Sequence, residues 1–284
     1  MTATPLWLRS WSLVVDTTAI DANSLDFSFE VTRSITHTPN KASVKVYNLS
    51  PTHRGQLTRL HRGHHPIFVE IHAGYQSQGA TPPRIFRGNL RSYKEIKQAG
   101  DYVSEIEGHD GGRQFVTARF SRAYPPGTPI GRVLTDLAAS LGLGPGNVAT
   151  LGAAQFGNRS TFPDGVVIHG SAASELRTLL RGARLTYSIQ SGALQLLPFG
   201  QAIQSTALVL SPGSGLLEAT HGKHNRVEVK TLLTPDLYPG RYLDVRGKIV
   251  QGFFRAHTVK YSGDTSGGDW TADASCDVLH TAVP

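Results

Sequence analysis

The clearest alternation of apolar and polar residues lies near the end of the chain, from residue 270 to residue 278. A period of two is typical of a strand with one buried and one exposed face. The run from Phe253 to Tyr261 is also strand-like, and the polar, glycine-rich segment 262–269 separates the two runs. We therefore predict that the chain closes with an antiparallel hairpin. The apolar face of its second strand comprises Trp270, Ala272, Ala274, Cys276 and Val278.

Two segments near the start of the chain, 25–35 and 41–47, alternate in the same way. They predict a second hairpin with one apolar and one polar face. Its apolar face comprises Phe27, Phe29, Val31, Ala42, Val44 and Val46. Its polar face would meet water or line a channel, and comprises Ser28, Glu30, Thr32, Ser43 and Lys45.

Further strands are predicted around this hairpin, at residues 11–16, 67–74, 85–90 and 102–107. Ser50 followed by Pro51 predicts the start of a short helix, because serine is a good N-cap and proline a good first helical residue. One short helix covers little of a sheet of six or seven strands. We therefore expect residues 1–115 to close into a barrel or a sandwich.

The pattern becomes mixed in residues 116–205. Thr128 and Pro129 predict the N-cap and first residue of a helix, with apolar positions spaced along one helical face and a stop at Gly142. Residues 143–165 are glycine-rich and predicted to be irregular. Ser171 predicts the cap of a second helix, and alternation from Leu185 onward predicts a hairpin. These features predict a small α/β domain.

Residues 206–284 return to strand patterns, so the order is β, then α/β, then β. We predict a mainly β fold with a small α/β insert and three domains, at residues 1–115, 116–205 and 206–284. In the last domain, Glu228 and Lys230 lie on the polar face of a predicted strand. They extend the set of candidate channel-lining residues.

Composition narrows the class of protein. The chain of 284 residues has 30 glycines and only 17% charged residues, which suits a turn-rich β protein. Its one cysteine, Cys276, lies on an apolar strand face and is expected to be a core side chain, so folding in a reducing cytoplasm is expected. The start of the chain does not resemble a secretory signal, and no segment is long and apolar enough to predict a membrane span.

The formal charge is +7 and the isoelectric point is about 9.6. The basic residues are scattered and form no block of five or six like charges. This distribution favours a solvated surface or an acidic assembly partner over a dedicated nucleic-acid groove.

Candidate chemistry is sparse. His61, His64 and His65 form the best metal-like cluster, but no cysteine or carboxylate lies at a useful spacing, so exposed loop histidines are favoured. Asp264 and Asp269 match no calcium loop and are expected to be solvated at a hairpin tip. No carboxylate pair, nucleophile elbow or phosphate-binding loop is recognised. We therefore predict no catalytic residue, metal or cofactor, and a protein that is not an enzyme.

Three segments resemble one known family. They read TPDLYPGRYLDV at 234–245, VKYSGDTSGGDW at 259–270 and VYNLSPTHRGQL at 46–57. Their order and spacing resemble the baseplate hub, or tail-tip, proteins of tailed bacteriophages, which are related to the N-terminal hub part of type VI secretion spike proteins. The resemblance implies two tail-tube-like antiparallel β-barrel domains in each chain, and a homotrimer that places six such domains around a channel.

The resemblance also implies a role and partners. The chain would be a structural virion protein, made in the host cytoplasm and located in the tail baseplate. It would join the six-fold tail tube, or a distal tail protein, to a three-fold spike or tip protein, with a tape-measure protein as a further partner and DNA passing transiently through the lumen. The candidate lining residues are Ser28, Glu30, Thr32, Ser43, Lys45, Glu228 and Lys230.

Two other classes of protein remain open from the sequence. A nucleic-acid-binding module built on a basic β-barrel would fit the isoelectric point, and its affinity would fall steeply with salt. A tail-associated carbohydrate-active enzyme or adhesin would need a carboxylate pair in a cleft, which the sequence does not reveal.

Overall fold

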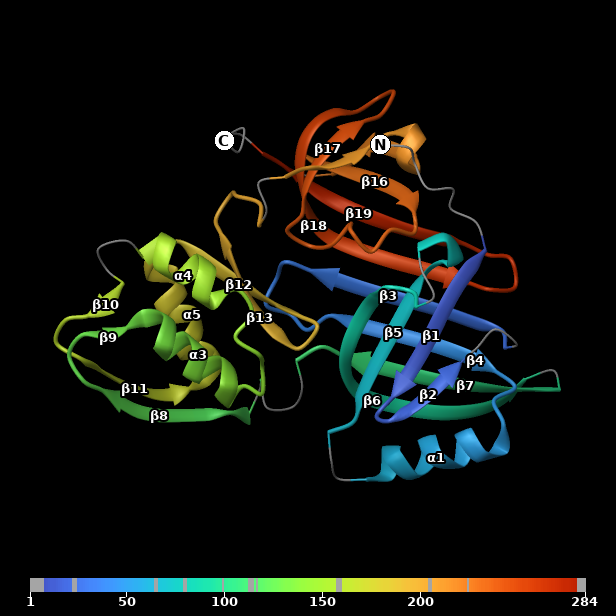
Figure 1. The fold of residues 1–284 in the computed structure, drawn as a ribbon, viewed down its shortest axis with the longest axis horizontal. Helices are drawn as coiled ribbons and strands as arrows, with labels where there is room; N and C mark the ends of the chain where they lie inside the picture. Colours follow the sequence, from blue (N-terminus) through green and yellow to red (C-terminus); the bar gives the residue numbers. More distant parts are fainter. Residues whose placement is uncertain are drawn as a thin grey trace.

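The computed structural model describes residues 8–21, 25–63, 66–78, 81–98, 100–111, 115, 117–156, 160–203, 206–223 and 225–279. The described chain is mainly β, with two β units and a smaller α/β insert between them in sequence (Figure 1). The predicted fold class is therefore confirmed.

The first β unit contains seven strands and one helix among its described residues. The strands are β1 (Arg9–Val15), β2 (Thr18–Asp21), β3 (Phe27–Ser34), β4 (Lys41–Tyr47), β5 (Phe68–Tyr75), β6 (Arg84–Gln98) and β7 (Asp101–His109). The helix is α1 (Pro51–Arg62), and a 3₁₀ turn, η1 (Gln76–Gln78), follows β5. The Ser50 hydroxyl accepts a hydrogen bond from the His53 backbone N–H at 3.2 Å, so the predicted cap and helix start are confirmed.

The second β unit follows residue 205. Its strands are β14 (Leu208–Leu210), β15 (Leu216–His221), β16 (Arg226–Leu232), β17 (Tyr242–Arg246), β18 (Gln251–Asp264) and β19 (Trp270–Val278), with a 3₁₀ turn, η3 (Pro212–Ser214), between the first two. Strands β18 and β19 pair from Phe254 to Gly263 and form the predicted closing hairpin.

The two β units are joined in one sheet. Among the described residues the strand order is β15-β16-β19-β18-β3-β4-β7-β6-β5-β1-β2, and off this path β17 pairs with β18 and with β14. The link is the antiparallel pairing of β18 with β3, which sets Thr258 opposite Ser34 and Asp264 opposite Ser28. Among the described strands this order is an open path. The expected closure of each β unit into its own barrel is therefore not observed, because β3 pairs with β18 of the second unit.

A single hydrophobic core fills both β units. It contains a chain of aromatic contacts in which the Trp11 and Phe27 rings stack at 3.7 Å and Phe29 meets Trp270 edge-on at 5.4 Å. The Trp270 indole N–H donates to the Gly74 carbonyl at 3.2 Å, so the closing hairpin is tied to the first β unit. The shared core and the shared sheet make the two β units one body.

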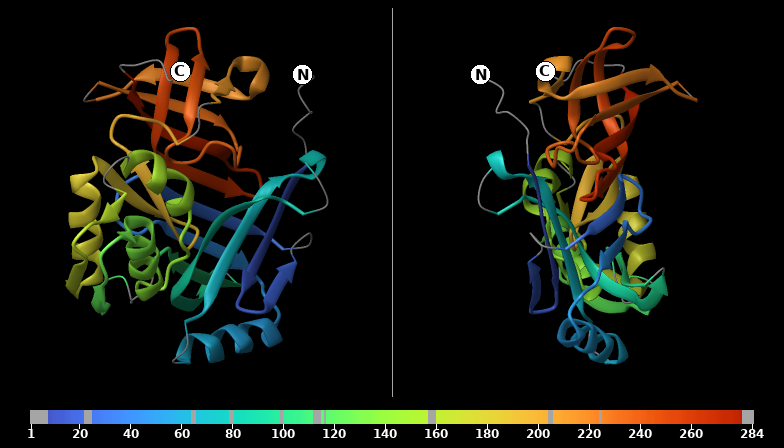
Figure 2. Two further views of the ribbon diagram at one scale, coloured as in Figure 1. Left: turned by 60° about the vertical axis from the view of Figure 1, so that its left-hand side comes forward. Right: turned by 90° about the vertical axis from the view of Figure 1, so that its right-hand side faces the viewer.

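The insert has a core of its own. It contains β8 (Arg119–Tyr124), β9 (Thr128–Pro129), α3 (Ile130–Ser140), α4 (Val148–Phe156), β10 (Thr161–Phe162), β11 (Val166–Ser171), α5 (Ala172–Gly182), β12 (Leu185–Gln190) and β13 (Ala193–Pro198). The helices pack with the β12–β13 hairpin and the two-stranded β8–β11 sheet around Leu134, Leu137 and Leu176. Figure 2 shows the insert to one side of the β units.

Two local predictions in the insert were wrong. Helix α3 begins at Ile130, after Pro129, because Thr128 pairs with Phe162 in the short β9–β10 ladder and its hydroxyl donates to the Pro125 carbonyl at 2.7 Å. The segment predicted to be irregular contains helix α4, whose alanine-rich sequence does not gather its apolar residues on one face. The division into three domains at 115/116 and 205/206 stays a prediction.

A candidate channel-lining face

The first five candidate residues lie on one face of the joined sheet. Ser28, Glu30 and Thr32 are on β3, and cross-strand pairing sets Ser28 opposite Lys45 and Glu30 opposite Ser43 on β4. Residues paired across antiparallel strands point to the same side. The sequence alone predicts this arrangement, because β3 and β4 are neighbours in the chain.

The remaining two candidates join the same face through the closing hairpin. Thr32 pairs with Lys260 on β18, Lys260 pairs with Asp273 on β19, and Asp273 pairs with Lys230 on β16. Glu228 lies two residues before Lys230 on β16, so it points to the same side. The structure therefore brings all seven candidates onto one continuous face, called here the polar face, although β4 and β16 are far apart in the sequence.

The opposite side of these strands is the core. Phe27, Val31, Val44, Val229 and Ala274 are each at most 2% exposed. The apolar side of both predicted hairpins is therefore buried, as the alternation indicated. That the polar face lines a channel stays a prediction.

Ion pairs neutralise two lysines of the polar face. Lys45 lies 3.1 Å from Glu105 of β7, and Lys260 lies 2.8 Å from Glu30. Both pairs are partly exposed, so each contributes little to stability, but they balance charge across neighbouring strands. Glu105 and Lys260 are therefore further members of this face, which the sequence did not single out. Both lie at alternate positions of predicted strands, but their partner strands could not be assigned from the sequence.

A third ion pair lies near the tip of the closing hairpin. Lys230 of β16 lies 3.8 Å from Asp269, the residue before β19. Asp273 lies on β19, between β16 and β18. The pKa of the Asp273 carboxyl is raised, mainly by partial burial, and the nearby Lys230 opposes that shift. Lysine and carboxylate thus alternate along this part of the face as well.

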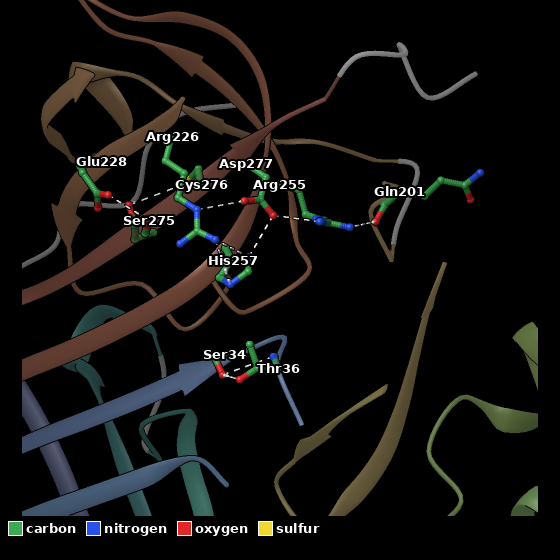
Figure 3. A network of polar contacts seen from close by, with 11 residues as sticks. Ser34, Thr36, Gln201, Arg226, Glu228, Arg255, His257, Ser275, Cys276 and Asp277 are labelled. Carbon is green, nitrogen blue, oxygen red and sulfur yellow. Dashed lines mark hydrogen bonds and ion pairs between the residues drawn. The ribbon is translucent and has the colours of Figure 1, made fainter. Parts of the chain in front are cut away.

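A cluster of charged residues, called here the Asp277 cluster, lies at one end of the polar face (Figure 3). The Asp277 carboxylate accepts hydrogen bonds from Arg255 at 2.8 Å and from His257 Nδ1 at 3.0 Å, and Arg226 Nε lies 3.3 Å away. Burial alone would raise the pKa of Asp277, but the hydrogen bonds from His257 and Arg255 outweigh it and hold this pKa well below its usual range.

The candidate metal ligands do not converge. His61 lies in the last turn of α1, and His64 and His65 lie outside the described residues. The Asp264 carboxylate accepts a hydrogen bond from the Ser266 backbone N–H at 2.7 Å, within the hairpin tip. Within the described part of the chain, no three His, Cys, Asp or Glu side chains are grouped to hold a metal ion.

The single cysteine belongs to the core. Cys276 is fully buried, as predicted, and burial raises the pKa of its thiol. A buried thiol of raised pKa carries little thiolate, so it suits packing better than nucleophilic chemistry.

The fold of this chain is similar to that of several solved tail proteins. No family model matches the sequence, and no curated protein matches it. Among solved structures, the 43 kDa tail protein of prophage MuSo2 from Shewanella oneidensis matches with a TM-score of 0.62 at 10% identity, covering 94% of this chain and 98% of that one. A tail protein from Neisseria meningitidis MC58 matches with a TM-score of 0.63 at 9% identity, covering 96% and 97%.

This chain has the fold of phage tail proteins. A third match, with a TM-score of 0.53 at 9% identity, is an E. coli component of the type VI secretion system described as similar to the T4 tail proteins gp27 and gp5. It covers 96% of this chain and 80% of that one. The resemblance drawn from the three sequence segments is thus confirmed at the level of the fold. No helix in the described ranges is long and apolar enough to cross a membrane.

Proposed function

We propose that this chain is a structural subunit of a phage tail, forming a trimeric hub around a central channel. The observation that carries the proposal is the polar face, which crosses both β units without a break and is backed by one core. The tail-protein fold supports the same role. A sheet with core on one side and polar residues on the other suits the wall of a water-filled lumen.

Three copies would present six β units to the channel. In a closed ring of identical subunits, first and second β units would alternate around the opening. The pairing of β18 with β3 fixes the two β units of one chain relative to each other. Such a ring would match a six-fold tail tube, or a distal tail protein, on one side and a three-fold spike or tip protein on the other.

The charge on the polar face suits the passage of DNA. Lys45, Lys230 and Lys260 are each paired with a carboxylate, which weakens their attraction for phosphates, whereas Lys41, opposite Thr32 on the same face, is exposed. Much of the excess positive charge lies elsewhere, because residues 116–205 carry seven arginines and three acidic residues. This distribution favours transient contact with DNA in a tail over the nucleic-acid-binding alternative. A tape-measure protein would be a further occupant of the lumen, and the chain would act in the virion tail baseplate without catalysing a reaction.

Light scattering behind a sizing column tests the assembly. We expect a species of three times the chain mass of 30.6 kDa, in an equilibrium that shifts toward it as concentration rises. A monomer at every soluble concentration would contradict a trimer formed by this chain alone. Salt-titrated binding to duplex DNA, measured on the same sample, distinguishes the hub from the nucleic-acid-binding alternative. Only the alternative predicts tight binding that weakens steeply with salt.

A further inference from the structure

The tip of the β12–β13 hairpin joins the insert to the β units through polar contacts. The hydrophobic cores of the two parts are separate clusters of buried residues. Residues 189–192 of the tip bond to the end of β3, to the residue before β4 and to the residue after β7. Figure 1 shows this hairpin between the helices of the insert and the β units.

Asn40 and Gln190 form the centre of this contact. The Asn40 amide donates to the Ile189 carbonyl at 2.6 Å, and the Gln190 amide donates to the Ser34 carbonyl at 2.8 Å. Arg33 Nε donates to the Gln190 side-chain oxygen at 3.0 Å. Asn40 is 3% exposed, so its bonds are made where little water can compete.

Asp110 completes the contact from the segment after β7. Its carboxylate is buried and accepts a hydrogen bond from the Gly192 backbone N–H at 2.8 Å. Burial raises the pKa of Asp110, and the bonds from Gly192 and Asn40 oppose that shift. We call Arg33, Asn40, Asp110 and Gln190 the latch.

A cavity of about 340 Å³ lies beside the latch. Asp110, Gly192 and Asn89 line it, and so do Gly142 and Gly144 from the segment after α3. A cavity of this size with polar groups in its wall has room for water. Asp110 is only 1% exposed, so water in the cavity can replace the Asp110–Gly192 bond only when the hairpin tip moves.

The other end of the hairpin is anchored. After β13, the Ile203 backbone N–H donates to the Gly240 carbonyl at 3.0 Å, and Arg255 donates to the Gln201 carbonyl at 2.9 Å. Gly240 has no room for a side chain, because Leu197 and Ile203 lie directly against it. The hairpin is thus held by packing at its base and mainly by polar bonds at its tip, where Ile189 also lies against Gly111 and the Tyr187 ring lies 5.9 Å from the His37 ring.

We propose that the insert is a hinged body that the latch holds against the β units. Release of the latch lets the hairpin tip move away, while the segment 197–203 stays in place as the hinge. Separate cores allow this motion without opening either core. The inference concerns one chain and does not depend on the proposed ring.

Spin-label distance measurements on the whole chain test the hinge. Nitroxides on Ser43→Cys of β4 and Arg181→Cys of α5, both exposed positions, report the distance between the two bodies in a dilute sample where the chain is monomeric, and the buried Cys276 stays unlabelled. We expect one narrow distance distribution with the latch intact. Asn40→Ala and, separately, Gln190→Ala should broaden it and add longer distances.

The matched control is Asn147→Ala. Asn147 makes the same kind of bonds, to the backbone of Leu196 at 2.9 and 2.7 Å, but both partners belong to the insert. This variant should leave the distribution unchanged.

A milder variant keeps the test decisive if an alanine variant fails to fold. Asp110→Asn preserves the shape of the side chain and places an amide opposite the Asn40 amide, which lies 3.3 Å from the carboxylate. It should also broaden the distribution. Latch variants that remain folded by circular dichroism and keep the narrow distribution would contradict the hinge.

Discussion

At the scale of single residues, the Asp277 cluster shows how the fold uses charge. The Asp277 carboxylate pairs with Arg226, Arg255 and His257, which Figure 3 shows gathered around it. These side chains come from β16, β18 and β19 at the end of the polar face. Because the pKa of Asp277 is lowered in the folded protein, the fold stabilises the ionised carboxylate more than the protonated carboxyl.

Asp277→Asn should therefore destabilise the protein in a pH-dependent way. A lowered folded-state pKa contributes stability that is present above the ordinary carboxyl pKa of 3.8 and is lost as the pH falls through the folded-state value. We expect a loss of about 1–2 kcal/mol at pH 7, because solvent reaches part of the carboxylate, and a smaller loss near pH 3. Urea unfolding at the two pH values measures both.

Asp244→Asn is the matched control. Asp244 pairs with Arg246 at 2.7 Å on β17, but the arginine side chain is 63% exposed. An exposed pair is screened by solvent, so its loss should cost much less than the loss at Asp277. Equal losses for the two variants, or an Asp277→Asn loss that does not change with pH, would show that the cluster does not act through ionisation.

At the scale of elements, the closing hairpin depends on a close approach between strands. Gly263 of β18 pairs with Phe29 of β3 on one side and with Trp270 of β19 on the other. A Cβ atom at this position would overlap the Phe29 ring and lie 2.8 Å from the Trp270 ring. The two rings cover the glycine and tie the two β units together.

Gly263→Ala should therefore overpack this junction and destabilise the protein by about 1–3 kcal/mol. Gly55→Ala is the control, because Gly55 lies within α1 and a Cβ there meets nothing within 4 Å. It should stabilise the protein by about 0.5–1 kcal/mol. Urea unfolding of both variants decides the point, and a neutral Gly263→Ala would contradict the close approach.

Local pattern was enough to predict much of this element structure. The faces of β3, β4 and β19 followed from alternation, and the start of α1 followed from Ser50 and Pro51. The pairing of β3 with β18 could not be predicted, because it joins segments from opposite ends of the chain. The latch was missed for the same reason, since Asn40 and Gln190 are polar residues whose partners are set by tertiary packing.

At the scale of the whole molecule, we propose that the polar face lines a channel in a closed ring. Electron cryomicroscopy of the purified chain, at concentrations where it assembles, tests this most directly. We expect a three-fold ring in which β3, β4 and β16 turn Glu30, Lys45 and Glu228 toward a central opening. A ring whose polar face points outward, or is buried between subunits, would contradict it.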